Sequence, residues 1–296
     1  MKTASILICA LNEEASIGNL LDSLKNQVNC GEYNIKKILV VSDGSVDKTN
    51  LVVQSRRAFD PRIVLIENES RKGKINSLVD TFRELNEDVI VSLDADISVH
   101  QDAITNLLSN FSNEKAILVG GNPVPAEIAK TSTVAEKAGM FSWYLLNAIK
   151  ATNPKSIYSA HGRILGLKRE LYKRIVTPKT SIGTDQLMYI VAKGSFIYKH
   201  NAVVYYTLPR TIADYVKQNK RFRRAKYEHG IEFNDANSFF QIESKAKVLF
   251  KTFIQHPLSG LAWSFLYVYG KISFYLEMKN KQGLDSIWSE VKSTKV

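Results

Sequence analysis

The chain has 296 residues, of which 45% are hydrophobic and 23% charged, and its formal net charge is +11. This apolar content supplies a sizeable core and excludes a disordered chain, and the length fits one large α/β domain or a core domain with an extension. The two cysteines, Cys9 and Cys30, have no metal-type spacing and no disulfide framework, which favours a reducing compartment. No secretory signal is expected, because the chain enters an apolar run at Ile6. The positive charge indicates an anionic partner: nucleic acid, an acidic membrane face or a phosphorylated substrate.

The first half of the chain alternates between short apolar runs and segments of helix length. The runs, which are typical of strands, are residues 4–10, 35–41, 62–66 and 89–93. The segments whose apolar residues recur at helical spacing are 14–27, 47–59 and 74–85. This alternation predicts an α/β fold with a mainly parallel, Rossmann-like central sheet and helices on both faces.

The pattern changes after the glycine pair at 120–121. The elements expected beyond it are a long helix at 131–151, a strand at 157–167, a short helix at 182–192 and a β-rich run at 196–207. From residue 211 almost to the C-terminus the pattern is helical.

The most informative stretch is an apolar strand that stops at two carboxylates, Asp94 and Asp96, separated by one small residue. In an extended chain residues i and i+2 point the same way, so this pair could hold one hard cation. Mg²⁺ and Mn²⁺ prefer oxygen ligands, and Mg²⁺ is usually held by carboxylates together with substrate phosphates. Taken alone, such a pair also suits a solvated turn or a helix cap.

Polar loops follow four successive strands of the predicted sheet. They are residues 12–14, 43–45, 67–74 and 94–96. Ligands of open α/β sheets bind beyond the carboxyl ends of the strands. We therefore expect these loops to meet at one edge and to form a single site.

Six segments, in this order, resemble the family 2 inverting glycosyltransferases of GT-A fold. They are Leu11-Asn12-Glu13-Glu14, Asp43-Gly44-Ser45 with Asp47, Gly73-Lys74, Asp94-Ala95-Asp96, Thr184-Asp185-Gln186 and Gln218-Asn219-Lys220-Arg221-Phe222. The last two are similar to the Thr-Glu-Asp and Gln-x-x-Arg-Trp motifs of the branch that includes cellulose, chitin and hyaluronan synthases. The resemblance covers residues 3–225, and the order of the motifs makes it specific.

The resemblance implies a nucleotide-diphosphate-sugar donor and a Mn²⁺ or Mg²⁺ ion that offsets the charge of its diphosphate. Asp96 would contact the metal directly, and Asp94 would lie near the ribose and the metal. The remaining donor contacts would be Asp43 to the base, Lys74 toward the nucleotide or diphosphate, and Asn12, Glu13 and Glu14 along the nucleotide pocket. Taken singly, Asn12 also suits a helix cap, Asp43 a turn and Lys74 an exposed position.

Asp185 is the candidate general base under this resemblance. Inversion requires an acceptor hydroxyl to attack opposite the leaving group, and a nearby carboxylate removes its proton. In the related synthases the last residue of Thr-Glu-Asp has this role, but Gln186 stands there and cannot ionise. The role therefore passes to Asp185, with a helix N-cap as the alternative.

The motif that begins at Gln218 lies in a basic helical stretch. Between residues 210 and 226 there are seven Lys or Arg and one acid. The resemblance makes Arg221 the residue that stabilises the departing diphosphate, with Gln218 among the donor-binding residues. Phe222 replaces the usual Trp, which keeps an aromatic face for a sugar but loses the indole N–H. A solvated basic helix face is the alternative.

Two histidines are further candidates. Relatives place a glycine-containing acceptor loop before an Arg/Lys-Glu pair, here Arg169-Glu170, and His161-Gly162-Arg163 lies at the corresponding place. An ordinary structural role for His161 is the alternative. His200 could complete a metal site, because some GT-A enzymes use a histidine.

The C-terminal part is expected to be a helical extension, 229–296, after a GT-A domain at 1–228. Residues 256–278 are rich in aromatic and aliphatic side chains but are borderline for a spanning helix. An amphipathic membrane-surface segment, a dimer-forming helix and a core helix all remain open.

These observations together predict an inverting, metal-dependent glycosyltransferase at the cytoplasmic face of a membrane. It would move a sugar, from a UDP-sugar by preference, to a hydroxyl of a lipid-linked or polysaccharide acceptor. A sugar-phosphate nucleotidyltransferase is an alternative, but it usually begins with a glycine-rich phosphate loop, and residues 6–14 contain no glycine. A nucleic-acid-binding module would explain the net charge but not the acidic loops, so no nucleic-acid partner is expected.

Overall fold

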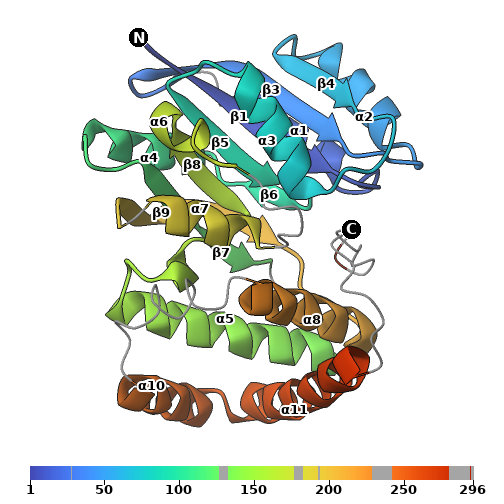
Figure 1. The fold of residues 1–296 in the computed structure, drawn as a ribbon, viewed down its shortest axis with the longest axis vertical. Helices are drawn as coiled ribbons and strands as arrows, with labels where there is room; N and C mark the ends of the chain where they lie inside the picture. The colour runs from blue at the N-terminus through green and yellow to red at the C-terminus, as the bar shows by residue number, and fades with distance from the viewer. Residues whose placement is uncertain are drawn as a thin grey trace.

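The computed structural model describes residues 1–27, 29–126, 133–176, 183–192, 194–228, 242–279 and 294. Figure 1 shows a central sheet flanked by helices and, beside one end of this sheet, a separate layer formed by the C-terminal helices and the long green helix of mid-chain. The Phe222 side chain, predicted to stack on a sugar, and most of the predicted extension at 229–241 and 280–296 lie outside the described residues.

The strands predicted for the first half form the parallel part of the sheet. β1 (Lys2–Ala10) pairs in parallel with β3 (Tyr33–Ser42) and with β5 (Val89–Asp94). β4 (Ile63–Glu67) extends the parallel set from β3. The carboxyl ends of all four strands therefore lie at one edge, as the sequence predicts.

Beyond β5 the sheet is mixed. β8 (Ile164–Lys168) is antiparallel to both β5 and β7 (Leu118–Pro125). β9 (Phe196–Tyr206) is parallel to β7 and antiparallel to β6 (Ile97–Val99). With β2 (Asn29–Cys30) at the far side, the strand order is β2-β3-β1-β5-β8-β7-β9-β6. The parallel arrangement thus covers the N-terminal strands. Sequence patterning missed three strands: the two-residue β2, the three-residue β6 and the Gly- and Pro-containing β7.

Helices cover both faces of the sheet, which confirms the predicted α/β architecture. Along β1, Ile6 and Ile8 join one apolar cluster while Leu7 and Cys9 join the other, because successive side chains of a strand point to opposite faces. The helices of the first face are α1 (Ile17–Leu24), α2 (Thr49–Arg57) and α4 (Ala103–Leu108). The helices of the second face are α3 (Lys74–Glu84), α6 (Arg169–Tyr172) and α7 (Thr184–Ala192). Burial raises the pKa of the Cys9 thiol to about 12, which fits its predicted role as a small core residue.

The remaining long helices stack beside the sheet. α5 (Val134–Thr152) and α8 (Ile212–Glu228) lie next to it, and α10 (Ile242–Gln255) and α11 (Pro257–Lys279) lie outside them (Figure 1). α11 packs against both inner helices.

Specific contacts fix α11 on the inner helices. The rings of Phe141 and Trp263 have their centroids 5.2 Å apart. On α8, Lys220 Nζ lies 2.9 Å from Glu277 Oε2, and the Arg223 guanidinium lies over the Tyr267 ring at 4.7 Å. The predicted extension therefore contacts helices of the predicted 1–228 domain directly.

We expect Gly121→Ala to destabilise the fold by about 1–3 kcal/mol, because a well-packed core does not accept an added methyl group. A Cβ at Gly121 would lie 2.6 Å from the Ala202 carbonyl oxygen and 2.7 Å from Ile164 Cγ2. Gly270→Ala is the matched control, since a Cβ there meets no described atom within 4 Å and alanine favours a helix. Guanidinium unfolding measures both variants, and equal stability of the two would contradict the packing at Gly121.

Candidate active site

The loops after β1 and β3 are bonded into one unit. Asn12, at φ 53°, accepts a hydrogen bond from the Val46 amide at 2.9 Å through Oδ1 and donates its own amide to Ser45 Oγ at 3.1 Å. Glu14 accepts from the Lys48 amide at 2.8 Å. The buried Glu13 carboxylate accepts from the Ser16 hydroxyl at 2.6 Å at the start of α1. Asn12 and Glu14 thus tie the two loops together, and Glu13 holds the start of α1. Contact of these three residues with a nucleotide stays a prediction.

Asp43 is the anchor of the next loop. Its buried carboxylate accepts hydrogen bonds from the amides of Lys72 at 2.9 Å and Gly73 at 2.8 Å. It also accepts from Asn68 Nδ2 at 3.0 Å and from Ser77 Oγ at 2.9 Å. Three of these four bonds fall on Oδ1 and one on Oδ2, so Oδ2 keeps the larger remaining acceptor capacity. Asp43 is therefore first a loop anchor, and the predicted bond to a base would have to use Oδ2.

The loop that Asp43 holds brings Lys74 to the end of β5. The Lys74 ammonium forms an ion pair with Asp94 Oδ1. Burial lowers the pKa of Lys74, but Asp94 and weaker contributions from Cys9 and Asp185 outweigh burial, and the net pKa is raised. Lys74 is therefore a charged group inside the site. The alternative that it is an ordinary exposed lysine is excluded.

Asp96 lies beside Asp94 in the same electrostatic cluster. Burial raises the pKa of Asp96 and the neighbouring Asp94 raises it further, while Arg163, Lys74 and Arg221 lower it. Two like charges at short range disfavour joint ionisation unless a cation lies between them.

Asp185 joins the cluster from the first turn of α7, which covers the same face of the sheet as α3. Its Oδ2 accepts a hydrogen bond from the Gly162 amide at 3.3 Å. Burial raises the pKa of Asp185, Lys74 lowers it, and Asp94 raises it. A carboxyl whose pKa is raised by burial in a polar cleft has the character of a general base.

Arg221 completes the cluster from α8. Burial lowers the pKa of its guanidinium, whereas Asp94, Asp96 and Asp185 raise it. Gln218 lies one turn earlier on the same helix and is partly buried. The structure therefore brings together Asp94, Asp96, Asp185, Lys74 and Arg221, which are far apart in the sequence, and Asp43 joins them through Gly73.

Near this cluster lie two residues of the predicted acceptor segment, Arg163 and His161, and one residue that sequence reasoning missed, Lys150. Arg163 donates from Nη1 to Nε2 of His161 at 3.0 Å, and its guanidinium lies over the Tyr206 ring at 3.7 Å. Burial and the charge of Arg163 lower the pKa of His161 well below its ordinary value, so this ring is neutral. Lys150, near the end of α5, is buried as well. The available signal for it was a lysine directly after the mostly apolar stretch 141–149.

The carboxylates suit a hard divalent cation as its protein ligands. Asp94 and Asp96 supply oxygen donors from one strand end, and their mutual repulsion is the penalty that a cation would remove. The described residues hold no group of three or more His, Cys, Asp or Glu around one point, so substrate oxygens or water would complete the coordination. His200 is exposed on β9, which gives no support to its predicted role as a ligand.

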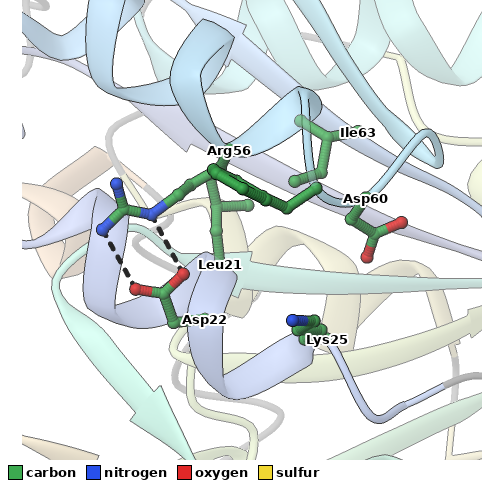
Figure 2. Close-up of a pocket in the computed structure, with 7 residues that line it drawn as sticks. Leu21, Asp22, Lys25, Arg56, Asp60 and Ile63 are labelled. Carbon is green, nitrogen blue, oxygen red and sulfur yellow. Dashed lines mark hydrogen bonds and ion pairs between the residues drawn. The ribbon is translucent and has the colours of Figure 1, made fainter.

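A hollow of about 250 Å³ lies away from this cluster, between α1, α2 and the start of β4. Figure 2 shows Arg56 and Asp22 meeting across it, with Arg56 Nε 2.9 Å and Nη2 3.0 Å from the two carboxylate oxygens. Leu21 and Ile63 add an apolar wall. Because its polar groups are already paired, this hollow belongs to the packing of α1 against α2.

Known proteins were compared with the chain. A family model described as glycosyl transferase family 2 matches residues 5–176. A poly-β-1,6-N-acetyl-D-glucosamine synthase of Staphylococcus aureus strain COL is 26% identical over 235 residues, 76% of this chain and 54% of the relative. The synthase of that name from Staphylococcus epidermidis is 24% identical over the same shares. The chain spans about half the length of these curated relatives.

Solved structures share the fold. A mannosyltransferase of Pyrobaculum calidifontis, PcManGT, in complex with GDP-Man and Mn²⁺ has a TM-score of 0.59 at 15% identity and covers 95% of this chain and 80% of its own. Glucosyl-3-phosphoglycerate synthase of Mycobacterium tuberculosis, in complex with Mn²⁺, UDP and glucosyl-3-phosphoglycerate, has a TM-score of 0.52 at 17% identity and covers 79% and 80%. The expected GT-A fold is thereby confirmed.

We expect Lys150→Met to stabilise the protein at pH 7, with a gain that disappears at alkaline pH. Burial and then Arg163 lower the pKa of Lys150 from 10.5 to about 8. The unfolded chain therefore binds more protons than the native one between pH 8 and 10.5, and the wild type gains stability as pH rises through this window. A shift of this size corresponds to up to about 3 kcal/mol.

The measurement is the difference in free energy of unfolding between wild type and Lys150→Met at pH 7, 8, 9 and 10.5. The difference isolates Lys150 from the other groups that titrate in this range. A difference that stays constant across the window would contradict a buried, charged Lys150.

Proposed function

Because the chain belongs to glycosyl transferase family 2, we propose that it transfers a sugar from a nucleotide-diphosphate donor, with UDP preferred, to a hydroxyl of a lipid-linked or polysaccharide acceptor. The observation that carries the proposal is that the carboxylates of Asp94, Asp96 and Asp185, which come from different elements, all act electrostatically on the buried guanidinium of Arg221. The two alternative functions, a nucleotidyltransferase and a nucleic-acid-binding module, do not explain why a carboxylate of α7 lies near this cluster.

The relatives support the donor and the acceptor class. The named products of the synthases are polysaccharides, and the compared structures hold GDP-Man or UDP together with Mn²⁺. By this likeness we assign a nucleotide-sugar donor and Mn²⁺ or Mg²⁺ to the chain, held by Asp94 and Asp96. Bound there, the cation would offset the negative charge of the leaving diphosphate.

Asp185 is proposed as the base of an inverting displacement. The acceptor hydroxyl would lie against its carboxylate, give up its proton and attack the anomeric carbon from the face opposite the diphosphate. The bond from the Gly162 amide orients the carboxylate, and burial raises its pKa and so its basicity. Arg221 and Lys74 supply donors for the charge that develops on the departing phosphate oxygens.

We expect Asp185→Asn to lower nucleotide-sugar turnover at least about 100-fold while leaving nucleotide affinity intact, because it removes the base and keeps the shape. Asp96→Asn should abolish the part of UDP binding that depends on Mn²⁺. Hydrolysis of a panel of nucleotide-sugars and thermal shift with UDP, each with and without Mn²⁺, measure the two effects. Asp102→Asn, on the exposed first turn of α4, is the control. Full transfer activity in both site variants would end the proposal.

The outer face of α11 supports a membrane-surface contact. Leu261, Phe265, Val268, Ile272 and Tyr275 recur at helical spacing on one face, and all are exposed, with Leu261 at 60% and Phe265 at 63%. Leu266, on the opposite face, is buried against α5, so a purely core helix does not describe this segment. Within the described part of the chain, no helix is both long and apolar enough to cross a bilayer.

Charge favours anionic lipid as the occupant of this face. Residues 246–276 contain three lysines and no acid, and Lys247, Lys251 and Lys271 are all exposed. An apolar stripe flanked by lysines is typical of helices that lie in the headgroup region of anionic leaflets. We propose this contact as the way the chain reaches a lipid-linked acceptor at the cytoplasmic face.

We expect Leu261→Glu with Phe265→Glu to abolish co-sedimentation with vesicles of equal parts phosphatidylglycerol and phosphatidylcholine. Vesicles of phosphatidylcholine alone should bind the wild type more weakly. Leu51→Glu, which places the same charge at an exposed leucine of α2, should bind as wild type does. Light scattering without lipid tests the other occupant: a dimer that dissociates in the double variant would assign the stripe to a second copy of the chain.

A further inference from the structure

A buried cation of α5, Lys150, adds to the cations that act on the carboxylates of the acidic cluster. Three cations near the acidic cluster, Lys74, Arg163 and Arg221, lower the pKa of Asp96. Lys150 is a fourth cation, 4% exposed, and its ammonium lies over the Tyr198 ring at 5.1 Å. Among the residues that the structure describes, the one charged group that shifts the pKa of Lys150 is another cation, Arg163. A buried charge without a counter-charge is unfavourable, so its presence calls for a partner that arrives from outside.

Arg163 shows where that partner would bind. The residue is 7% exposed, and its Nη1 donates a hydrogen bond to His161. One face of its guanidinium lies over the Tyr206 ring. Its Nε is buried and has no hydrogen-bond partner. Nε–H shares an edge of the planar guanidinium with Nη2, and this edge binds oxyanions through two parallel hydrogen bonds. His161, neutral and accepting from Nη1, holds the guanidinium in this orientation.

The place of Arg163 relates this site to the acceptor. Gly162, the preceding residue, donates its amide to Asp185 Oδ2 at 3.3 Å. The backbone that carries Arg163 therefore adjoins the proposed base, and its guanidinium also lowers the pKa of Asp96.

We propose that Lys150 and Arg163 form a seat for an oxyanion, a phosphate or a carboxylate, carried by the acceptor close to the hydroxyl that is glycosylated. The inference rests on the proposed function, because it places this seat beside the proposed base. It specifies the acceptor as an anionic hydroxyl compound and makes Lys150 and Arg163 the residues that select it over a neutral glycan.

The test uses the full chain and sn-glycerol 3-phosphate as the probe, with glycerate and glycerol as the carboxylate and neutral arms. Calorimetry without nucleotide should detect binding of at least one anionic probe and none of glycerol. Lys150→Met and Lys150→Gln should each lower the affinity for the anionic probe at least tenfold. Arg163→Lys, which lacks the planar guanidinium, should lower it by the same amount. Lys155→Met, at an exposed lysine in the loop after α5, should bind as wild type does.

UDP binding with Mn²⁺, measured on the same variants, separates this inference from the proposed function. We expect Lys150→Met to keep its UDP affinity and to lose anion binding. Its melting temperature should equal or exceed that of the wild type. Equal loss of UDP affinity would move Lys150 to the donor site and overturn the inference, as would anion binding that does not depend on Lys150. Failure of UDP to bind the wild type would instead count against the donor assignment, while the anion result would still decide the seat.

Discussion

The carboxylate of Asp43 is the constraint on which the rest of the site depends. Its four hydrogen bonds fix residues 68–77 against the end of β3, and this fixes Lys74 at the end of β5. Without that anchor, the buried Lys74–Asp94 ion pair would have no rigid geometry, and the acidic pair would lose its nearest counter-charge. Two of the anchoring bonds come from backbone amides and two from the side chains of Asn68 and Ser77, so the path of the loop depends on these two side chains as well.

A balance of buried charges then shapes the cleft. Three carboxylates from β5, its following turn and α7 lie among cations from α3, the turn before β8 and α8. Each group is costly to bury alone, and each lowers the cost of its neighbours. This explains why residues from so many elements converge.

Periodicity and end-of-strand polarity were enough to predict the parallel strands, both helical layers and the edge where Asp94 and Asp96 lie. The motif order predicted that Asp185 and Arg221 would join them. The antiparallel half was harder, because β6 spans three residues and β7 contains glycines and prolines that weaken a strand pattern. Lys150 could not be predicted as a site residue at all, since a lysine in a helix is normally solvated, and only the structure shows it buried with its ammonium over the Tyr198 ring. The hydrogen bonds to Asp43 could not be predicted either, because they depend on the path of the loop that follows β4.

The ion pair between Lys220 and Glu277 joins two surfaces with different tasks. Lys220 precedes Arg221 on α8, and Glu277 lies near the end of the helix whose outer stripe is apolar. Under the proposed membrane contact, a displacement of α11 would reach the guanidinium beside the acidic cluster through this side-chain bridge, with the Arg223–Tyr267 contact as a second link. Turnover would then differ between detergent solution and a lipid surface.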